Sequence, residues 1–378
     1  MKKIGIYVHI PFCMKKCFYC DFVSYCNKEN LVDEYIKCLK KEIESKKNKS
    51  KFGIDTIYIG GGTPSFINEN HIKDIIYILK ESFDIDKETE ITIEVNPGTV
   101  NENKLEMYKE VGINRLSMGL QSTNNELLKM LGRIHTYEQF LESYNMAKNI
   151  GFKNINVDLM IGLPNQKLEE VNDSVKKVIN LKPNHISVYS LILEEGTKIA
   201  KKIKKGELSL PKDELEREMY WNVKNQLQDN GYNHYEISNF AEKGFESKHN
   251  MNCWNQKEYL GFGAAAHSYF KSIRYSNIEN IEEYIKNIKN NEFEKNKEIH
   301  EIQTIDEAKK EYMLLGLRKI EGVNITEFKN KFIDNPLYLF RKELSKLVEE
   351  ELIEIDINTI KLTNKGIDLA NIVWEEFI

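Results

Sequence analysis

The sequence has no long apolar run, few cysteines and no excess of basic side chains. Polar residues interrupt every apolar stretch before the roughly 18 residues that span a bilayer, so we expect no membrane-spanning helix. Six cysteines in 378 residues are too few for the disulfide framework of a secreted scaffold. The net charge of −5 predicts no broad positive surface for nucleic acid. With 41% hydrophobic residues, we expect a globular, cytoplasmic protein.

Short β-rich runs alternate with longer helical runs in the first half of the chain. Runs rich in Ile, Val, Tyr and Leu predict strands at residues 4–10, 55–60, 90–95, 114–118, 154–161 and 185–192. Apolar residues at spacings of three and four predict helices at residues 31–45, 71–83, 101–111, 137–150 and 168–179. Repeated units of this kind form a parallel sheet with right-handed crossovers. Six units, rather than eight, predict an incomplete (β/α)6 barrel with its active site at the C-terminal strand ends.

The strand and helix rhythm changes twice, which predicts three domains. Residues 1–195 form the expected partial barrel, and residues 196–300 form an extension with a helix at 213–230 and a strand at 232–238. A polar, charged stretch at 290–301 is typical of a linker. In residues 301–378 we expect helices and a small hairpin, at 306–320, 325–332, 337–349, 352–355, 359–362 and 366–377. This order predicts a winged-helix-like α+β module.

The most informative local pattern is a C-x3-C-x2-C run directly after the first predicted strand. It contains Cys13, Cys17 and Cys20. Three thiolates in one short loop suit a soft metal centre. A structural zinc ion takes four ligands, for which His9 and Cys26 are candidates. A [4Fe–4S] cluster held by only three thiolates instead keeps one iron open for a ligand from outside the protein.

This run after the first strand of a partial barrel resembles the radical S-adenosylmethionine (SAM) superfamily. The resemblance implies that Cys13, Cys17 and Cys20 ligate a [4Fe–4S] cluster whose open iron is chelated by the methionine part of SAM. In that family the reduced cluster breaks the sulfonium C–S bond and yields a 5′-deoxyadenosyl radical. The cofactor performs this chemistry, and the protein positions it and excludes water.

The resemblance also assigns SAM-binding residues at or near the ends of the predicted strands. They are Tyr7, Gly61, Gly62, Thr63, Glu94, Gln121, Arg133 and Asp158. Glycines allow backbone carbonyls to approach an ammonium group, with which Glu94 would pair. Gln121 and Arg133 would hold the ribose and the SAM carboxylate, and Asp158 a ribose hydroxyl. Taken singly, the glycines also fit an ordinary turn, and the charged residues also fit structural ion pairs.

Longer motifs narrow the resemblance to the oxygen-independent coproporphyrinogen III oxidase branch. These motifs are YVHIPFC at 7–13, GGGTPS at 60–65 and RLSMGLQ at 115–121. The oxidases have the pattern C-x3-C-x2-C-x-C and a long segment before the strand that leads into the cysteines. This chain has Phe22 where that pattern has its fourth cysteine, and its Tyr7 lies near the start of the sequence. Both differences favour the heme chaperones of that branch, the HemW group. Radical decarboxylation in porphyrin biosynthesis is the alternative, and we expect no such oxidase activity.

A second motif points to heme as the cargo. The segment HNMNCW at 249–254 resembles the H-N-x-x-Y-W motif of the chaperones, with Cys253 in place of Tyr. The resemblance implies heme contacts by His249 and Trp254. Neutral imidazole is a common axial ligand of heme, but a histidine beside Asn and Trp also fits a hydrogen-bonded structural residue. The two interpretations stay open.

The same resemblance implies the partners. Heme would pass to an acceptor such as a respiratory enzyme, with peripheral membrane association through such partners, and an electron donor would reduce the cluster. A homodimer is compatible with the sequence. A zinc-stabilised DNA-binding regulator is a third hypothesis, but the acidic run Glu349 to Glu351 in the winged-helix-like module would repel phosphates. Cys26, Cys38 and Cys253 are expected to be packed thiols.

Overall fold

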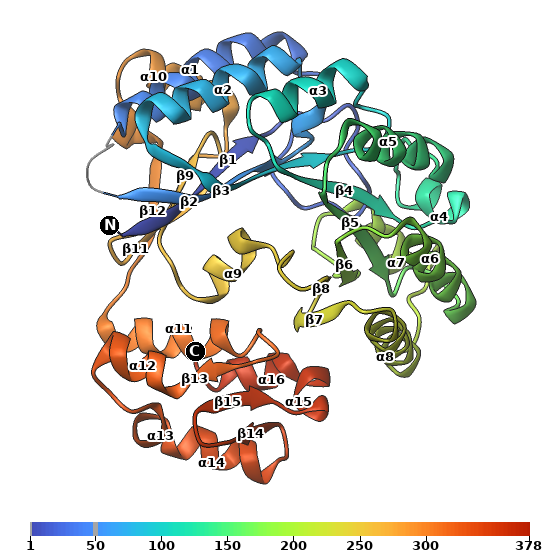
Figure 1. Ribbon diagram of the computed structural model, residues 1–378, viewed down its shortest axis with the longest axis vertical. Helices are drawn as coiled ribbons and strands as arrows, with labels where there is room; N and C mark the ends of the chain where they lie inside the picture. The colour runs from blue at the N-terminus through green and yellow to red at the C-terminus, as the bar shows by residue number, and fades with distance from the viewer. Residues whose placement is uncertain (1, 48–51) are drawn as a thin grey trace.

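The computed structural model describes residues 2–47 and 52–378, and a parallel sheet forms its centre (Figure 1). All six predicted strands are present, with ends within a few residues of the prediction except at β3, which begins six residues earlier. They are β1 (Lys3–Ile10), β2 (Gly53–Gly61), β3 (Asp84–Val95), β4 (Arg115–Gln121), β5 (Asn154–Ile161) and β6 (His185–Ser190). Each strand pairs in parallel with the next one along the chain. The predicted incomplete barrel is therefore confirmed.

Helices connect the strands and pack on the outer face of the sheet (Figure 1). They are α1 (Val32–Ser45), α2 (Glu69–Ser82), α3 (Glu102–Glu110), α4 (Asn125–Met130), α5 (Tyr137–Ile150) and α6 (Leu168–Leu181). The spacing of apolar residues explains the buried side of α1, where Tyr35, Leu39 and Ile43 are fully buried. α5 begins with a capping box between Thr136 and Gln139 and ends at Gly151, which has a left-handed backbone.

Short strands extend this sheet at both edges. They are β7 (Asn233–Glu236), β8 (Asn239–Ala241), β9 (Tyr259–Phe262), β10 (His267–Phe270), β11 (Ile273–Asn277) and β12 (Lys297–Ile302). The sheet order is β12-β11-β10-β9-β1-β2-β3-β4-β5-β6-β8-β7. The interpretation of residues 290–301 as a linker is wrong, because most of this stretch forms η3 (Phe293–Asn296) and the edge strand β12. Its polar composition reflects an edge strand that is largely exposed on both faces.

The segment after β6 also contributes four helices. They are α7 (Lys198–Lys204), α8 (Asp213–Asp229), α9 (Lys248–Trp254) and α10 (Ile281–Lys289). Side chains from α8 and α10, such as Met219, Leu227 and Tyr284, belong to the same buried core as those of the barrel. Residues 196–300 thus extend the partial barrel and share its core.

The C-terminal segment has a separate apolar core, which includes Met313, Phe328, Leu347 and Val373. Its helices are α11 (Ile305–Gly316), α12 (Ile325–Phe332), α13 (Pro336–Leu339), α14 (Arg341–Glu349), α15 (Asn364–Asp368) and α16 (Ala370–Glu375). A three-stranded sheet joins them, formed by β13 (Val323–Asn324), β15 (Thr359–Leu362) and β14 (Ile353–Ile355). This module lies beyond α9, on the side away from α1 and α2 (Figure 1). We call it the C-terminal module.

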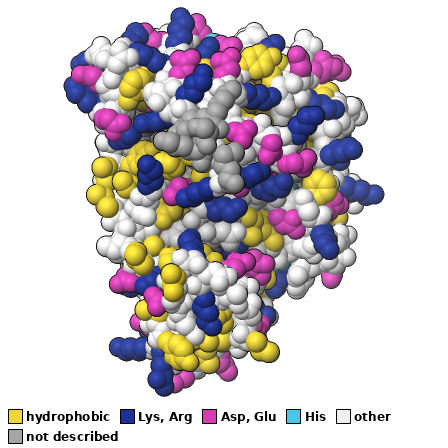
Figure 2. All heavy atoms as spheres, turned by 60° about the vertical axis from the view of Figure 1, so that its left-hand side comes forward, with side chains coloured by type: hydrophobic (Ala, Val, Ile, Leu, Met, Phe, Trp, Pro, Cys, Tyr) yellow, Lys and Arg dark blue, Asp and Glu magenta, His cyan; other side chains and the backbone are white. Residues whose placement is uncertain are grey.

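The described surface agrees with the composition. On the face shown in Figure 2, basic and acidic side chains are interspersed. Within residues 2–47 and 52–378, no helix combines the length and the apolar character that crossing a membrane requires.

Candidate cofactor site at the carboxyl ends of the strands

The three cysteines of the C-x3-C-x2-C run lie in a loop that follows β1, and all three line one cavity. Backbone hydrogen bonds close the loop, because Cys13 N donates to Tyr25 O at 3.0 Å and Tyr25 N donates to Pro11 O at 2.7 Å. Phe18 N donates to Leu131 O at 2.9 Å and so attaches the loop to the turn after α4. The thiols are free of disulfides. Local backbone pairing thus directs three thiols toward the same space.

Two glycines at the end of β2 allow this loop to come close. Gly61 has φ +112, and a Cβ there would lie 2.5 Å from the His9 ring. A Cβ on Gly62 would lie 2.8 Å from the carbonyl oxygen of Phe12 and 3.0 Å from Cys13 Sγ. Only glycine provides this clearance without displacement of the backbone. The glycine run is therefore part of the cysteine site and more than an ordinary turn.

His9 supports the loop and is not placed as a metal ligand. Its Nε2 is 2.9 Å from the carbonyl oxygen of Val23, and its Nδ1 is 2.9 Å from the Tyr7 hydroxyl. Both ring nitrogens are therefore engaged. Among the described residues, no group of three or more His, Cys, Asp and Glu side chains converges on a single metal position. In a [4Fe–4S] cluster the thiolates bind separate irons, so the cysteines can surround the cluster without such convergence.

Glu94, near the end of β3, is the principal carboxylate of the cavity. The Tyr58 hydroxyl donates to Glu94 Oε1 at 2.9 Å, and Gly61 N donates to Oε2 at 3.2 Å. Burial raises the pKa of Glu94 to about 7, with a further contribution from the charge of Asp158. Both hydrogen bonds favour the charged form but do not outweigh desolvation. Among residues 2–47 and 52–378, the Glu94 carboxyl group therefore has no cation partner.

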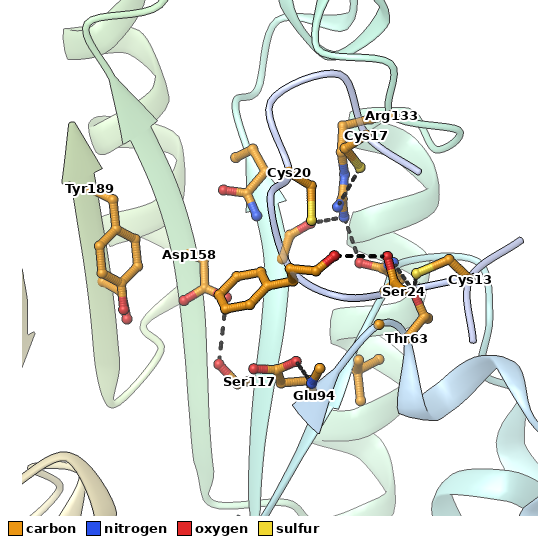
Figure 3. A pocket seen from close by; sticks show the side chains of 18 of the residues that line it. Cys13, Cys17, Cys20, Ser24, Thr63, Glu94, Ser117, Arg133, Asp158 and Tyr189 are labelled. Atoms are coloured by element: carbon orange, nitrogen blue, oxygen red, sulfur yellow. Dashed lines mark hydrogen bonds between the residues drawn. The ribbon is translucent and has the colours of Figure 1, made fainter. Parts of the chain in front are cut away.

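Asp158 on β5 also lines the cavity, beside Ser117 of the neighbouring strand β4 (Figure 3). Asn156 Nδ2 donates to Asp158 Oδ1 at 2.7 Å, and Ser117 Oγ donates to Oδ2 at 3.5 Å. Burial raises the pKa of this carboxyl group as well. Asn156 and Asp158 are two residues apart on the same strand, so both point into the barrel.

Arg133 connects the cysteine loop to the strand ends. Its Nη2 donates to Asn96 Oδ1 and to the carbonyl oxygen of Gly119, both at 2.6 Å, and its Nη1 lies 3.5 Å from Cys17 Sγ. Its buried Nε has no partner in the described structure. Figure 3 shows the guanidinium beside Cys17.

Thr63 and Gln121 complete the predicted cavity lining. Thr63 Oγ1 donates to Cys13 Sγ at 3.5 Å and accepts a hydrogen bond from Asn96 Nδ2 at 2.9 Å. Gln121 has φ +71, a left-handed backbone that is rare for a residue with a Cβ. The strand register also shifts between Gly119 and Gln121. Backbone strain of this kind is frequent at ligand sites.

Three predicted residues do not line this cavity. Tyr7 lies behind it, where its hydroxyl bonds to His9 and its ring stacks on Tyr58 with centroids 6.3 Å apart. His249 and Trp254 lie on α9. His249 is buried, its Nδ1 is 2.9 Å from Thr56 Oγ1, and its backbone N–H donates to Glu90. The Arg318 guanidinium lies 4.4 Å from the Trp254 ring centroid. These contacts fit the interpretation of His249 as a hydrogen-bonded structural residue.

The cavity has a volume of about 410 Å³, which is within the usual range for a small-molecule pocket. Its lining includes ten of the eleven residues predicted for the cluster and SAM; Tyr7 is the exception. It also includes residues that the sequence analysis did not select, namely Tyr58, Asn96, Arg115, Ser117, Asn156, Ser187, Tyr189 and Asn250. Ser117 and Asn156 could have been found, because each precedes a cavity residue by two positions on the same strand. The donor set fits both a three-thiolate cluster and a polar, cationic nucleoside.

Comparisons with known proteins show the family to which the chain belongs. The Radical SAM superfamily model matches residues 7–178, and the HemN C-terminal domain model matches residues 304–369. Heme chaperone HemW of Lactococcus lactis subsp. lactis (strain IL1403) is 38% identical, covering 100% of this chain and 98% of its own. Heme chaperone HemW of Bacillus subtilis (strain 168) is 39% identical, covering 98% of each chain.

A solved structure shows the same fold over the whole length. It is the coproporphyrinogen III oxidase HemN of Escherichia coli, described as a radical SAM enzyme. The TM-score is 0.86 at 24% sequence identity, with 100% of this chain and 90% of that chain covered. The two sequence relatives named above are heme chaperones, and the relative in structure establishes the fold alone. The chain therefore belongs to the radical SAM superfamily and, within it, to the family of the HemW heme chaperones.

Proposed function

We propose that this protein is a heme chaperone that holds a [4Fe–4S] cluster on Cys13, Cys17 and Cys20, binds SAM in the cavity and delivers heme to acceptor proteins. One observation supports this proposal most strongly. Three free thiols line the same cavity as the half-buried carboxyl groups of Glu94 and Asp158, in a chain related over its full length to HemW chaperones.

The proposed roles of the cavity residues follow from their chemistry. The SAM ammonium would lie against the Glu94 carboxylate and the backbone carbonyls near Gly61 and Gly62. Arg133 would bind the SAM carboxylate, and Gln121 would bind the ribose. Asp158 would accept a hydrogen bond from a ribose hydroxyl. Thr63 would orient Cys13 through its hydrogen bond to Sγ. When bound, cluster and SAM together supply one-electron cleavage of the sulfonium bond. Tyr7 would act indirectly, through Tyr58 and His9.

Proton movement at Glu94 follows from the proposed ammonium contact. Near pH 7 the Glu94 carboxyl group is protonated in about half of the protein molecules, because its pKa is about 7. An ammonium group beside Glu94 lowers this pKa and favours the carboxylate. SAM binding at pH 6.5 should therefore release protons, and none at pH 8.5. Calorimetry in two buffers of different ionisation enthalpy measures this release, and Glu94→Gln should abolish it.

The cargo and location belong to the same proposal. Heme would be passed in the cytoplasm to an acceptor such as a membrane-bound respiratory enzyme, and a low-potential electron donor would reduce the cluster. Heme contacts by His249 and Trp254 stay a prediction. The direct test is an anaerobic titration of the reconstituted protein with hemin, followed by incubation with a heme-free acceptor. A shifted Soret band that moves to the acceptor supports the proposal, and absence of heme binding at micromolar concentration contradicts it.

The oxidase activity is the second candidate, favoured by the whole-length likeness in fold to HemN. Phe22 stands where the oxidase pattern has its fourth cysteine. We therefore expect no decarboxylation of coproporphyrinogen III in the presence of SAM and a reductant. Formation of protoporphyrinogen and carbon dioxide at a catalytic rate would favour the oxidase instead.

A further inference from the structure

The opening of the cavity carries exposed apolar side chains that the proposed cluster and SAM contacts do not use. Phe22 is 63% exposed and Tyr189 is 40% exposed, and both line the cavity. Met14 and Ile134, 55% and 43% exposed, line a small depression next to it that also includes Cys17 and Arg133. Large apolar side chains gathered around an opening are typical of a binding surface.

Two lysines lie among these apolar side chains. Lys15 and Lys16 line the same cavity, and Lys16 Nζ donates to the carbonyl oxygen of Phe22 at 2.8 Å. Within residues 2–47 and 52–378, neither lysine forms an ion pair with a carboxylate. We call Met14, Lys15, Lys16, Phe22, Ile134 and Tyr189 the mouth surface. It combines aromatic and aliphatic area with uncompensated positive charge.

The size of the cavity excludes a porphyrin beside the proposed nucleoside. Glu94, Arg133 and Asp158 line the cavity, and its volume of about 410 Å³ suits one nucleoside-sized molecule. A porphyrin is wider and apolar, so it would lie across the opening once the cavity holds a nucleoside. At that position its ring would contact Phe22 and Tyr189, and its two propionates would lie near Lys15 and Lys16.

The alternative position on α9 is closed. His249 is buried against Thr56, with its ring centroid 5.2 Å from that of Tyr58, and Trp254 is in contact with Arg318 of the segment after α11. A heme at His249 would require that α9 leave the barrel. The mouth surface requires no such rearrangement, and its openness suits a cargo that another protein must collect.

We infer that the mouth surface binds heme, as a planar apolar dianion, with Phe22 contacting the macrocycle and Lys15 and Lys16 neutralising the propionates. This inference rests on the proposed chaperone function and assigns its cargo site. It also gives a role to the side chain at the position where the oxidase pattern has a cysteine.

The test is an anaerobic Soret titration of the full, cluster-loaded chain with hemin and with hemin dimethyl ester. Phe22→Ser should weaken the binding of both probes at least tenfold. The double variant Lys15→Gln/Lys16→Gln should weaken hemin at least fivefold and leave the uncharged ester within twofold of wild type. Tyr338→Ser, on an 80% exposed aromatic of the C-terminal module, is the matched control and should match wild type. Iron content and SAM affinity verify that each variant keeps its cofactor site.

The outcomes separate this inference from the proposed function. If wild type binds no hemin, the chaperone proposal itself fails. If wild type binds hemin and both mouth-surface variants titrate like wild type, heme binds elsewhere and the mouth-surface site is refuted. Loss of hemin binding in a folded His249→Gln variant, with Phe22→Ser unaffected, would assign the cargo to α9.

Discussion

Glu94 is a residue at which binding and stability oppose each other. Its carboxyl pKa is about 7 in the folded chain and near 4.5 when the group is unconstrained. Between these two pH values the folded state holds more protons than the unfolded state, so stability falls as pH rises from 4.5 to 7. Above pH 7 the full cost of a buried, unpaired carboxylate is present.

Glu94→Gln should therefore stabilise the ligand-free protein at pH 8 by roughly 1–3 kcal/mol and leave its stability at pH 4 nearly unchanged. Urea unfolding at both pH values measures this effect. The same variant should lose most of its SAM affinity, because the ammonium loses its carboxylate partner. Glu298→Gln, on an exposed residue of the edge strand β12, is the control. Equal pH dependence in wild type and Glu94→Gln would contradict the assigned pKa.

Gly62 tests the cysteine loop directly. In Gly62→Ala the new Cβ would meet Phe12 O and Cys13 Sγ at 2.8 and 3.0 Å, so the loop must move. We expect a folded protein with less than half of the wild-type iron and sulfide after reconstitution. Gly244→Ala strains a left-handed backbone with φ +89, but its Cβ would meet nothing within 4 Å, so this control should keep its full iron content. A Gly62→Ala protein with four irons per chain would show that this clearance is unnecessary.

The family resemblance predicted which residues gather at the strand ends, since Cys13, Glu94, Arg133 and Asp158 all line one cavity. Tyr7 was expected there as well, but its ring lies behind Tyr58. The position of a residue along its strand indicates at which end of the barrel the residue lies. It does not indicate which neighbouring ring lies in front, because that depends on side-chain packing between strands.

At the scale of elements, α9 is important because its histidine enters the barrel. Burial lowers the pKa of His249 to about 4, whereas the ordinary value is 6.5. The unfolded chain therefore takes up a proton below pH 6.5 that the folded chain does not, and stability falls as pH decreases from 6.5 to 4. The Thr56 hydrogen bond holds the neutral ring in place.

We predict that His249→Gln reduces this acid sensitivity. The loss of unfolding free energy between pH 7 and pH 5 should be smaller in the variant by roughly 2 kcal/mol. Hydrogen exchange of residues 248–254 should be faster at pH 5 than at pH 7 in wild type, after correction for the intrinsic rate. His300→Gln, on an exposed histidine of β12, is the matched control. An unchanged pH profile in His249→Gln would contradict the assigned role.

The elements that sequence patterns missed include the helices α4, α7, α9 and α10 and short strands without a recognisable turn. The hairpin of β10 and β11 turns at Lys271 and Ser272, both with positive φ and neither a glycine or asparagine. The usual hairpin signal is therefore absent. β12 was mistaken for a linker because an edge strand needs no apolar alternation when its faces are exposed. The long strands and helices were predictable because each has a continuous buried side.

At the scale of the whole molecule, Arg318 connects the barrel and the C-terminal module. Its guanidinium lies 4.4 Å from the ring centroids of both Trp254 on α9 and Trp374 on α16. Cation–π contacts of this kind contribute about 1 kcal/mol each. The C-terminal module is thus attached to the helix that closes the barrel.

Arg318→Ala should destabilise the chain by roughly 1–3 kcal/mol and increase hydrogen exchange in both α9 and α16. The exposed Arg341 of α14 provides a matched control, because Arg341→Ala should change neither exchange nor stability by more than about 0.5 kcal/mol. Increased exchange in α16 alone would show that the two parts are not coupled through this residue.

The proposed function requires that three cysteines hold a cluster with one iron open to SAM. Electron paramagnetic resonance of the reduced, reconstituted protein with and without SAM tests it most directly. We predict a [4Fe–4S]+ signal whose g values change on addition of SAM, and no such signal when Cys13, Cys17 and Cys20 are replaced by alanine. A spectrum that SAM leaves unchanged, or a cluster retained by the triple variant, would contradict the claim.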